Sequence, residues 1–444
     1  MNATNTIEPD LLIPKLQEAL AQANLDDDPA LKCSELMKLG QAYLDKKEAP
    51  AALTQFEEAL KIAHKMEDKR FQAKLFGFKG LALKMLGNYS AALQAFRKSN
   101  GIATRLKHDP LLCDSSFQIG ILKSIMGNRE SALDDLTRAF EIAARLGDRA
   151  RELRSADTLA DNFYALQTFD KAREYYHLGL ELAVGLGNPE AECSLLTKLA
   201  NVSLAAGEPE TAIKEYERAL DIASAIESRM AEINILGGLF RANALAGNAN
   251  LAIIYGEKII QLSRDIHHFD AEITNIHALA NFLVEQGQVS EALAYLGEGQ
   301  ELAEKNQSRE WLLTILVDAG AAYRGSGDLQ AAVDKFKGAL SIGTGIGDKP
   351  SIAKILRYLS AIEAERDRLT ESIQYAERAL EFAQESQNIE LAGEQHMLLA
   401  LNYRDLDQRG KAIQSCQAAL ASYKEIGTTE MLAKAEALCV ELQQ

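Results

Sequence analysis

The sequence is poor in proline and in aromatic residues. Its 444 residues include only 8 Pro and a single Trp, and aromatic side chains make up 6% of the chain. Because proline breaks helices, this scarcity and a hydrophobic content of 47% indicate a helical protein rich in Ala and Leu. The five Cys include no CxxC pair, which favours a reducing compartment.

Two further absences bear on location and partners. No apolar run approaches the roughly 20 residues of a membrane span, and the start, MNATNTIEPD, lacks the basic and apolar regions of a signal peptide. The formal net charge of −16 and the pI near 5.1 would repel a nucleic acid. We therefore expect a cytoplasmic protein that binds a protein or peptide, with no nucleic-acid or membrane partner; the oligomeric state stays open.

What the chain does contain is a repeat with a period of 40 residues and no insertions. One column of the repeat holds a small residue in every row: Ala52, Ala92, Ala132, Ala172, Ala212, Ala252, Ala292, Ala332, Ser372 and Ala412. A third of a row earlier, a large apolar residue followed by Gly or Ala recurs, as at Leu39-Gly40 and Leu399-Ala400. Helix axes approach to about 8–10 Å only where side chains are small, so the columns indicate one helix crossing repeated down the chain.

Each row carries two signals that end a helix. The first is a glycine suited to a left-handed helix terminus, at Gly87, Gly127, Gly207, Gly247, Gly287 and Gly327. The second is a side chain that can cap the next helix, at Asp28, Asp68, Asp148, Asn188, Ser228, Ser308, Asp348, Asn388 and Thr428. The signals predict a helix A at row positions 29–45 and a helix B at 50–66, each near 25 Å long.

The predicted architecture is an all-α solenoid with half a repeat at each end. Residues 1–28 form an N-terminal capping segment with a helix at Leu11–Ala23, and residues 429–444 form a C-terminal capping helix. Between them we predict ten repeats: 29–68, 69–108, 109–148, 149–188, 189–228, 229–268, 269–308, 309–348, 349–388 and 389–428.

The columns resemble the tetratricopeptide repeat (TPR), whose signature is W-x2-LG-x2-Y followed by A-x3-F and A. Leu39-Gly40-x2-Tyr43 and Ala52-x3-Phe56-x2-Ala59 match it, although the signature Trp is absent. The 40-residue period is similar to the longer-helix subclass of Pins/LGN-type adaptors and of bacterial TPR proteins. The resemblance implies a right-handed superhelix in which the helices A line a concave groove.

On helix A, the columns that face such a groove vary from row to row. In the first three repeats they are largely apolar, whereas later repeats offer polar side chains. The predicted partner-binding residues are Arg154, Asp157, Asp161, Tyr164, Asn201, Asn234, Arg241, His277, Asn281, Arg324 and Arg357. They fit either a solvated channel wall or a set of ligands for a peptide, in which Asn grips the backbone and Arg and Asp select charge. The carboxylate clamp of Hsp70/Hsp90 co-chaperones is absent, since Thr197 and His277 stand where it has Lys.

Chemistry at a catalytic or metal site is not indicated. Gly343, Gly345 and Gly347 imitate a phosphate loop, but they end a predicted helix B and follow no strand. His267 and His268 fall in a turn, and no carboxylate or thiol stands at chelating spacing from His277. We therefore expect no cofactor and no metal.

The leading hypothesis is a non-catalytic scaffold or adaptor that binds an extended peptide or partner domain in the groove. The alternative is a sensory or regulatory module of a signalling protein, whose superhelix changes conformation on ligand binding. The alternative gains if the natural reading frame continues beyond Gln444. An enzyme is the third class, and no nucleophile or cofactor loop in the sequence favours it.

Overall fold

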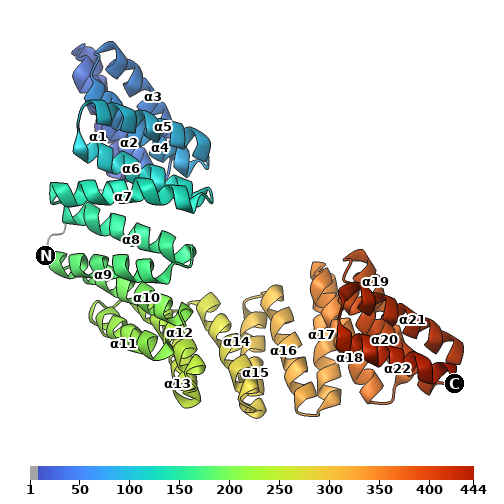
Figure 1. The fold of residues 1–444 in the computed structure, drawn as a ribbon. Coiled ribbons are helices and arrows are strands. Elements are labelled where there is room, and N and C mark those ends of the chain that lie inside the picture. The colour runs from blue at the N-terminus through green and yellow to red at the C-terminus, as the bar shows by residue number, and fades with distance from the viewer. Residues whose placement is uncertain (1–8) are drawn as a thin grey trace. The chain divides into compact units, whose positions relative to one another are not determined.

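The computed structural model describes residues 9–444, and within this range the chain forms 22 α-helices and no strand (Figure 1). The helices A are α2 (Pro29–Asp45), α4 (Lys69–Met85), α6 (Asp109–Ile125), α8 (Arg149–Ala165), α10 (Pro189–Ala205), α12 (Arg229–Leu245), α14 (Phe269–Glu285), α16 (Arg309–Gly325), α18 (Lys349–Glu365) and α20 (Ile389–Asp405). The helices B are α3 (Ala49–Lys65), α5 (Tyr89–Arg105), α7 (Arg129–Leu146), α9 (Phe169–Leu186), α11 (Pro209–Ala225), α13 (Ala249–Asp265), α15 (Val289–Lys305), α17 (Leu329–Ile346), α19 (Leu369–Glu385) and α21 (Arg409–Ile426).

The all-α repeat architecture is confirmed. Helix A occupies the predicted row positions, whereas helix B begins at row position 49, one residue earlier than predicted. The chain divides into two compact units, which we call unit 1 (up to Ala242) and unit 2 (from Asn243). Each unit is described by itself below.

The turns between helices follow one backbone plan. Every junction between consecutive helices contains one residue with positive φ, which is Gly in some rows and a residue such as Lys107 or Gln167 in others. The next residue caps the following helix: Asp148 accepts a hydrogen bond from the amide of Arg151 at 3.1 Å. Tight turns of this kind place consecutive helices antiparallel and side by side.

The caps differ from the prediction at two kinds of position. Ser308 and Thr428 begin their helices without a side-chain hydrogen bond. His268 serves as a cap instead, because its Nδ1 accepts from the Ala271 amide at 3.1 Å, and His108 acts in the same way. The pair His267–His268, which might suggest a metal ligand, is thus a left-handed turn residue followed by a helix cap.

The small columns of the sequence form the core. Ala52 and Ala92, like Ala59 of the second column, are completely buried. A large side chain on helix B fills the space that a small residue on helix A leaves open: a Cβ added to Gly40 would lie 2.4 Å from the ring of Phe56. Since real Cβ atoms do not approach a ring so closely, glycine is required where this ring packs.

Packing runs between neighbours along the chain. Within each unit the described contacts join consecutive helices and, more weakly, one helix A to the next, as in α4 with α6 and α18 with α20. The apolar core accordingly forms a series of clusters, one of which extends from Ala103 of α5 to Val202 of α10. Such nearest-neighbour packing is typical of a solenoid.

Single helices cover both ends of the repeat array. The predicted N-terminal segment begins with residues 1–8, which lie outside the described residues, and continues as α1 (Pro9–Leu25), which packs against α2. At the other end α22 (Thr429–Gln443) packs on α21. A disulfide between Cys416 and Cys439 joins these two helices, which differs from the expectation of reduced thiols; Cys33, Cys113 and Cys193 are free and buried.

Candidate functional site

All of the predicted groove residues lie on helices A, but they belong to both units. Unit 1 contains Arg154, Asp157, Asp161 and Tyr164 on α8, Asn201 on α10, and Asn234 and Arg241 on α12. Unit 2 contains His277 and Asn281 on α14, Arg324 on α16 and Arg357 on α18. One continuous ligand-binding surface formed by all of these residues therefore remains a prediction. The residues of the two units are described separately.

In unit 1, one lysine ties two of the predicted acidic residues together. Lys198 of α10 reaches back to α8, with its Nζ 2.6 Å from Asp157 Oδ1 and 3.0 Å from Asp161 Oδ1. Burial disfavours the charged lysine, but the two carboxylates outweigh it and raise the pKa of Lys198. Burial also raises the pKa of Asp157 in spite of the lysine. Lys198 and the two carboxylates are thus already paired with one another within the protein.

Asp161 and one further predicted residue, Asn201, accept hydrogen bonds from buried tyrosines. Tyr176 donates its hydroxyl hydrogen to Asp161 at 2.6 Å, and Tyr216 donates to Asn201 at 2.6 Å. Burial raises the pKa of both tyrosines, partly opposed at Tyr216 by the charge of Arg241. Because a buried hydroxyl needs an acceptor, Asp161 and Asn201 have a structural role.

The remaining predicted residues of unit 1 are more accessible. Asn234 and Tyr164 are exposed, and Tyr164 lies 6.0 Å from the ring of Phe169 in a tilted arrangement. Arg241 is exposed too, but it donates from Nε to the carbonyl of Gly237 at 3.4 Å and also interacts with the buried Tyr216. Asn234 and Tyr164 are therefore the more accessible of these side chains.

In unit 2, His277 lies in a small polar cluster that the sequence spacing did not indicate. Its Nε2 is 2.6 Å from Asp318 Oδ2, a carboxylate on the next helix A, and 3.0 Å from Asn281 Nδ2. Trp311 contacts the imidazole edge-on, with 5.8 Å between the ring centroids. Among residues 9–444 no three His, Cys, Asp or Glu side chains form a group that could hold a metal ion.

An open cavity of about 520 Å³ lies on the helix A side of unit 1. Its apolar part includes Met37, Phe78 and Leu81, from α2 and α4. Charged residues line it as well: Lys74 from α4, Asp114 from α6, and Arg151 and Arg154 from α8. Four successive helices A thus contribute to one cavity, at the columns that the resemblance assigned to the groove.

Carboxylate and ring contacts position the two arginines. Arg151 Nε lies 2.9 Å from Asp114 Oδ1, and Arg151 also pairs with Asp148. Arg154 Nη2 is 3.4 Å from the same Asp114 oxygen, and its guanidinium lies 4.2 Å above the centre of the Phe117 ring. Arg154 is therefore held at the cavity but shares its only carboxylate with Arg151.

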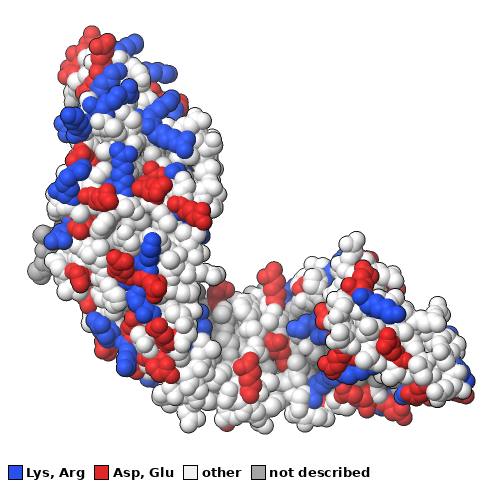
Figure 2. Space-filling view, in the orientation of Figure 1, with Lys and Arg blue, Asp and Glu red and all other residues white. Residues whose placement is uncertain are grey.

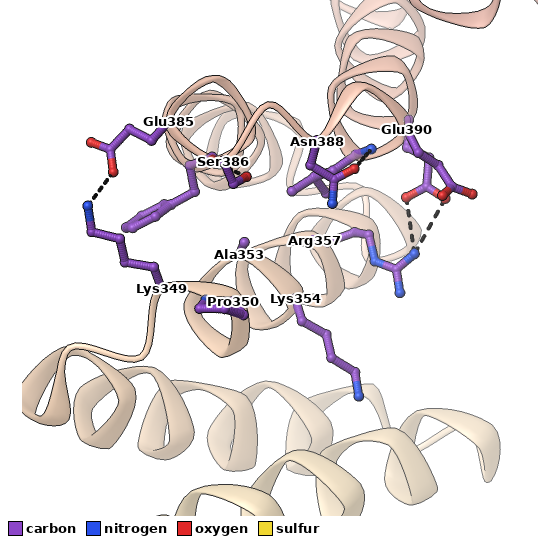
Figure 3. Close-up of a pocket in the computed structure, with 12 residues that line it drawn as sticks. Lys349, Pro350, Ala353, Lys354, Arg357, Glu385, Ser386, Asn388 and Glu390 are labelled. Carbon is purple, nitrogen blue, oxygen red and sulfur yellow. Dashed lines mark hydrogen bonds and ion pairs between the residues drawn. The ribbon is translucent and has the colours of Figure 1, made fainter. Parts of the chain in front are cut away.

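Two cavities in the described part of unit 2 include predicted residues of its helices A. The larger, about 620 Å³, lies between α18, the end of α19 and the start of α20 (Figure 3). Figure 3 shows Lys349 facing Glu385, and the ion pair between Lys349 Nζ and Glu385 Oε2 measures 2.7 Å. Arg357 Nη1 lies 3.1 Å from Glu394 Oε2. The second, about 400 Å³, shares Arg357 and Glu394 with the first and adds Arg324 and an apolar lining. That lining includes Tyr358, Ala361, Met397, Leu398 and Leu401.

Several cavity residues were not among the sequence predictions. They are Lys74, Asp114 and Arg151, with Lys84 bonded to the lining residue Gln118. The sequence did not indicate them, because the predicted polar residues lie in the later repeats and the groove columns of the first three repeats are largely apolar. A signal was available: residues 69–108 contain no Asp or Glu at all. In a chain with a net charge of −16, such a stretch points to a basic surface.

Comparisons with known proteins agree with this architecture. A family model for the tetratricopeptide repeat matches residues 311–385, from α16 to the end of α19. No curated protein is significantly similar to the chain. Within residues 9–444, no helix has both the length and the apolar character needed to cross a bilayer.

Solved structures show the same fold over a longer part of the chain. The apo form of RapI is 13% identical, with 80% of this chain and 98% of RapI covered and a TM-score of 0.57. A signal-transduction ATPase of the STAND class from Pyrococcus horikoshii, which has a tetratricopeptide repeat sensor, is 13% identical over 92% of this chain and 74% of its own, with a TM-score of 0.52. Part of a TPR repeat-containing protein from Cytophaga hutchinsonii is 16% identical over 64% of this chain and 98% of its own, with a TM-score of 0.49. The family match thus identifies residues 311–385 as tetratricopeptide repeats, and the similarity to RapI and to the STAND protein shows that the described chain has the same all-α fold as these two structures.

Proposed function

We propose that the chain is a non-catalytic scaffold that binds an extended peptide or a partner domain on its helix A face. One observation carries the proposal: the helix A columns expected to face a groove line open cavities in both units. The cavities combine apolar surface with a few charged groups, which is the composition of a site that binds protein side chains. TPR proteins bind protein or peptide partners, and the TPR fold is generally a non-catalytic scaffold.

The structure changes which residues should be tested. Replacing Asn201 removes the acceptor of the Tyr216 hydroxyl, so a loss of binding in that variant would have two causes. A substitution that fills a cavity blocks the proposed site without removing an internal hydrogen bond. In unit 1, Gly77→Leu adds a side chain where a Cβ meets only Ser99 Oγ, at 3.8 Å. In unit 2, Ala361→Leu does the same, since Ala361 is half-buried and lines the smaller cavity.

The experiment is affinity purification of the full chain with quantitative mass spectrometry, followed by direct binding of each captured partner. Matched controls are Gln94→Leu and Gln374→Leu, which place the same side chain on exposed positions of helix B. We expect the cavity variants to lose partners that the controls retain. Identical partner sets for all four variants and the wild type would remove the support for the groove.

A second candidate function is a sensory or regulatory module. It is favoured by the fold similarity to the STAND protein with a TPR sensor and by the division of this chain into two compact units. A sensor changes conformation when its ligand binds. Fluorophores at Gln94→Cys in unit 1 and Gln374→Cys in unit 2 would report a changed distance on partner binding. An unchanged fluorescence signal at a saturating partner concentration would contradict the sensory module, and only the scaffold function would remain.

The finer family assignment also remains a prediction. The 40-residue period is similar to that of Pins/LGN-type adaptors, and a cytoplasmic location fits a helical repeat chain with these features. Fluorescence microscopy of the tagged chain would check the location, and the captured partners would check the kinship.

A further inference from the structure

The second repeat carries positive charge only. Between residues 69 and 108 there is no acidic residue, while the basic residues are Lys69, Arg70, Lys74, Lys79, Lys84, Arg97, Lys98, Arg105 and Lys107. The rest of the chain is strongly acidic, since the whole has a net charge of −16. Figure 2 shows blue side chains gathered over the first helices of unit 1. A concentration of one sign on a background of the other favours a partner of the opposite charge.

One of these lysines lines the open cavity of unit 1, and a second contacts a lining residue. Lys74 lines it directly, and Lys84 Nζ donates to Gln118, another lining residue, at 3.2 Å. Neither lysine forms an ion pair with any residue between 9 and 444. Lys79 differs, because it pairs with Glu57 at 2.7 Å. Lys74 and Lys84, the two lysines at the cavity, are thus among the basic residues of the second repeat that have no ion-pair partner within residues 9–444.

The charges at the cavity are unbalanced. Lys74, Arg151 and Arg154 line the cavity, Lys84 donates to the lining residue Gln118, and Asp114 is the one carboxylate in this lining. Burial lowers the pKa of Lys84, and so does repulsion from the charge of Arg154. A bound carboxylate would relieve this repulsion. We call this set of residues, with Phe78 and Leu81, the cationic pocket.

The pocket also has an apolar side. Phe78, Leu81 and Met37 are half-buried, and the absence of a side chain at Gly77 keeps the space between them open. A volume of about 520 Å³ is enough for a few amino-acid side chains. A nucleic acid or a membrane surface would use broad charge and would leave such a cavity empty. The combination of cations with apolar surface fits a peptide that carries both acidic and apolar residues.

Resting on the function proposed above, we propose that the cationic pocket binds an acidic peptide segment of a protein partner. A carboxylate of the segment lies between Lys84, Lys74 and Arg154, and a neighbouring apolar side chain packs against Phe78 and Leu81. The segment runs across α4, α6 and α8, the helices that supply these residues.

The test uses the full chain and defined probes. A fluorescent 12-residue peptide of alternating Glu and Leu is titrated by anisotropy and compared with the same peptide in which Gln replaces Glu. Lys84→Gln and Arg154→Gln each should weaken the acidic peptide about tenfold, the effect of losing a charged hydrogen bond. Gly77→Leu should abolish binding without loss of helicity, because its side chain fills the pocket. Arg97→Gln and Lys107→Gln remove equal charge from exposed positions and should change the affinity less than twofold.

Competing outcomes are distinct. Equal affinity for the Glu and Gln peptides, or equal losses in Lys84→Gln and Lys107→Gln, would overturn the proposal. Single-stranded DNA and phosphatidylserine vesicles are titrated in parallel, and tighter binding of either would assign the basic surface to that partner instead. If Gly77→Leu loses a captured protein partner while the acidic peptide never binds, the groove function stands and the acidic specificity fails.

Discussion

At the scale of single residues, the left-handed turn position varies although the backbone does not. Gly87 has φ 73° and Lys107 has φ 51°, each at the junction before a helix cap. A Cβ at Gly87 would meet no neighbouring atom, so the only penalty for a side chain there lies in the backbone. A non-glycine residue in this conformation is destabilised by roughly 1–2 kcal/mol, partly offset by the lower entropy of its unfolded chain.

These positions predict opposite effects of glycine exchange. Lys107→Gly should stabilise the α5–α6 hairpin by about 0.5–1 kcal/mol, and Gly87→Ala should destabilise α4–α5 by a similar amount. Hydrogen exchange of the amides in these helices measures both changes. Lys107→Ala is the control, since it keeps the strained φ and removes only the side chain. A gain equal to that of Lys107→Gly in this control would show that charge, not backbone strain, is responsible.

Residues that look like ligands can instead complete the core. Where the large helix B residue is Phe96, the facing position on helix A is Leu81; where it is Tyr216, that position is Asn201. The hydrogen bond between Tyr216 and Asn201 explains the difference, because only the tyrosine needs an acceptor. The polar column that suggested peptide binding is thus partly explained from within the fold.

A double-mutant cycle tests this pairing. Asn201→Leu leaves the Tyr216 hydroxyl without its acceptor and should destabilise the fold by about 1–2 kcal/mol. Adding Tyr216→Phe recreates the Phe96–Leu81 pair and should recover most of that loss. Thermal unfolding of the two single variants and the double variant gives the coupling. Strictly additive effects would mean that the hydrogen bond does not contribute to the free energy of unfolding. Asn201 would then again be a candidate residue for binding a peptide.

At the scale of the helix, the capping residue at the start of a helix A stabilises that helix by accepting hydrogen bonds from its free backbone amides. The Asp148 carboxylate accepts from the amides of Arg151 and Ala150, and these backbone bonds together with the guanidinium of Arg151 lower its pKa despite the opposing effect of burial. Asn188 and Asn388 cap in the same way without a charge. The cap itself therefore needs only an acceptor, while the carboxylate adds a dependence on pH.

The pH dependence of this cap has a definite sign. The pKa of Asp148 is lower in the folded than in the unfolded protein, so its charge stabilises the fold above the unfolded value near 3.8. This contribution disappears as the pH falls through the folded-state pKa. Asp148→Asn should therefore lower the melting temperature more at pH 7 than at pH 3. Asp148→Ala should lose about 1 kcal/mol of capping at both pH values and, at pH 7, the charge contribution in addition. An equal difference between wild type and Asp148→Asn at the two pH values would contradict the charge effect.

At the scale of the whole molecule, stability is expected to be local. Each helix packs on its neighbours in the chain, and the described contacts reach no further than the next helix of the same kind. A defect should therefore spread over adjacent repeats only. The division into unit 1 and unit 2 adds a second boundary that a defect need not cross.

A polar residue in the last small column tests this locality. Ala412 is completely buried, so Ala412→Asp places a charge in the core of the C-terminal repeat. Hydrogen exchange should show α20 to α22 losing protection, while α2 to α8 of unit 1 keep theirs. Loss of protection in both units together would indicate a single cooperative structure.

The disulfide joins two different columns of the repeat. Cys33, Cys113 and Cys193, by contrast, share one column, lie two repeats apart and are free. Cys416 and Cys439 are 23 residues apart, close to the spacing of 22 that stacks Phe56 on Phe78 with 5.5 Å between the ring centroids. The repeat register therefore held the signal for this pair, between columns instead of within one.

By itself, the sequence determined the helices, the turns that separate them and the buried columns, from Ala52 to Ala412. It could do so because turn glycines, caps and small residues act locally and recur with a constant period. A signal seen in one repeat is therefore checked by the residues at the same position of the other repeats. Only the tertiary structure decided which groove side chains remain available to a partner. Asn201 and Tyr216, or Lys84 and Arg154, come from different helices and meet only when those helices pack. Their mutual distance, burial and charge set the chemistry of the groove.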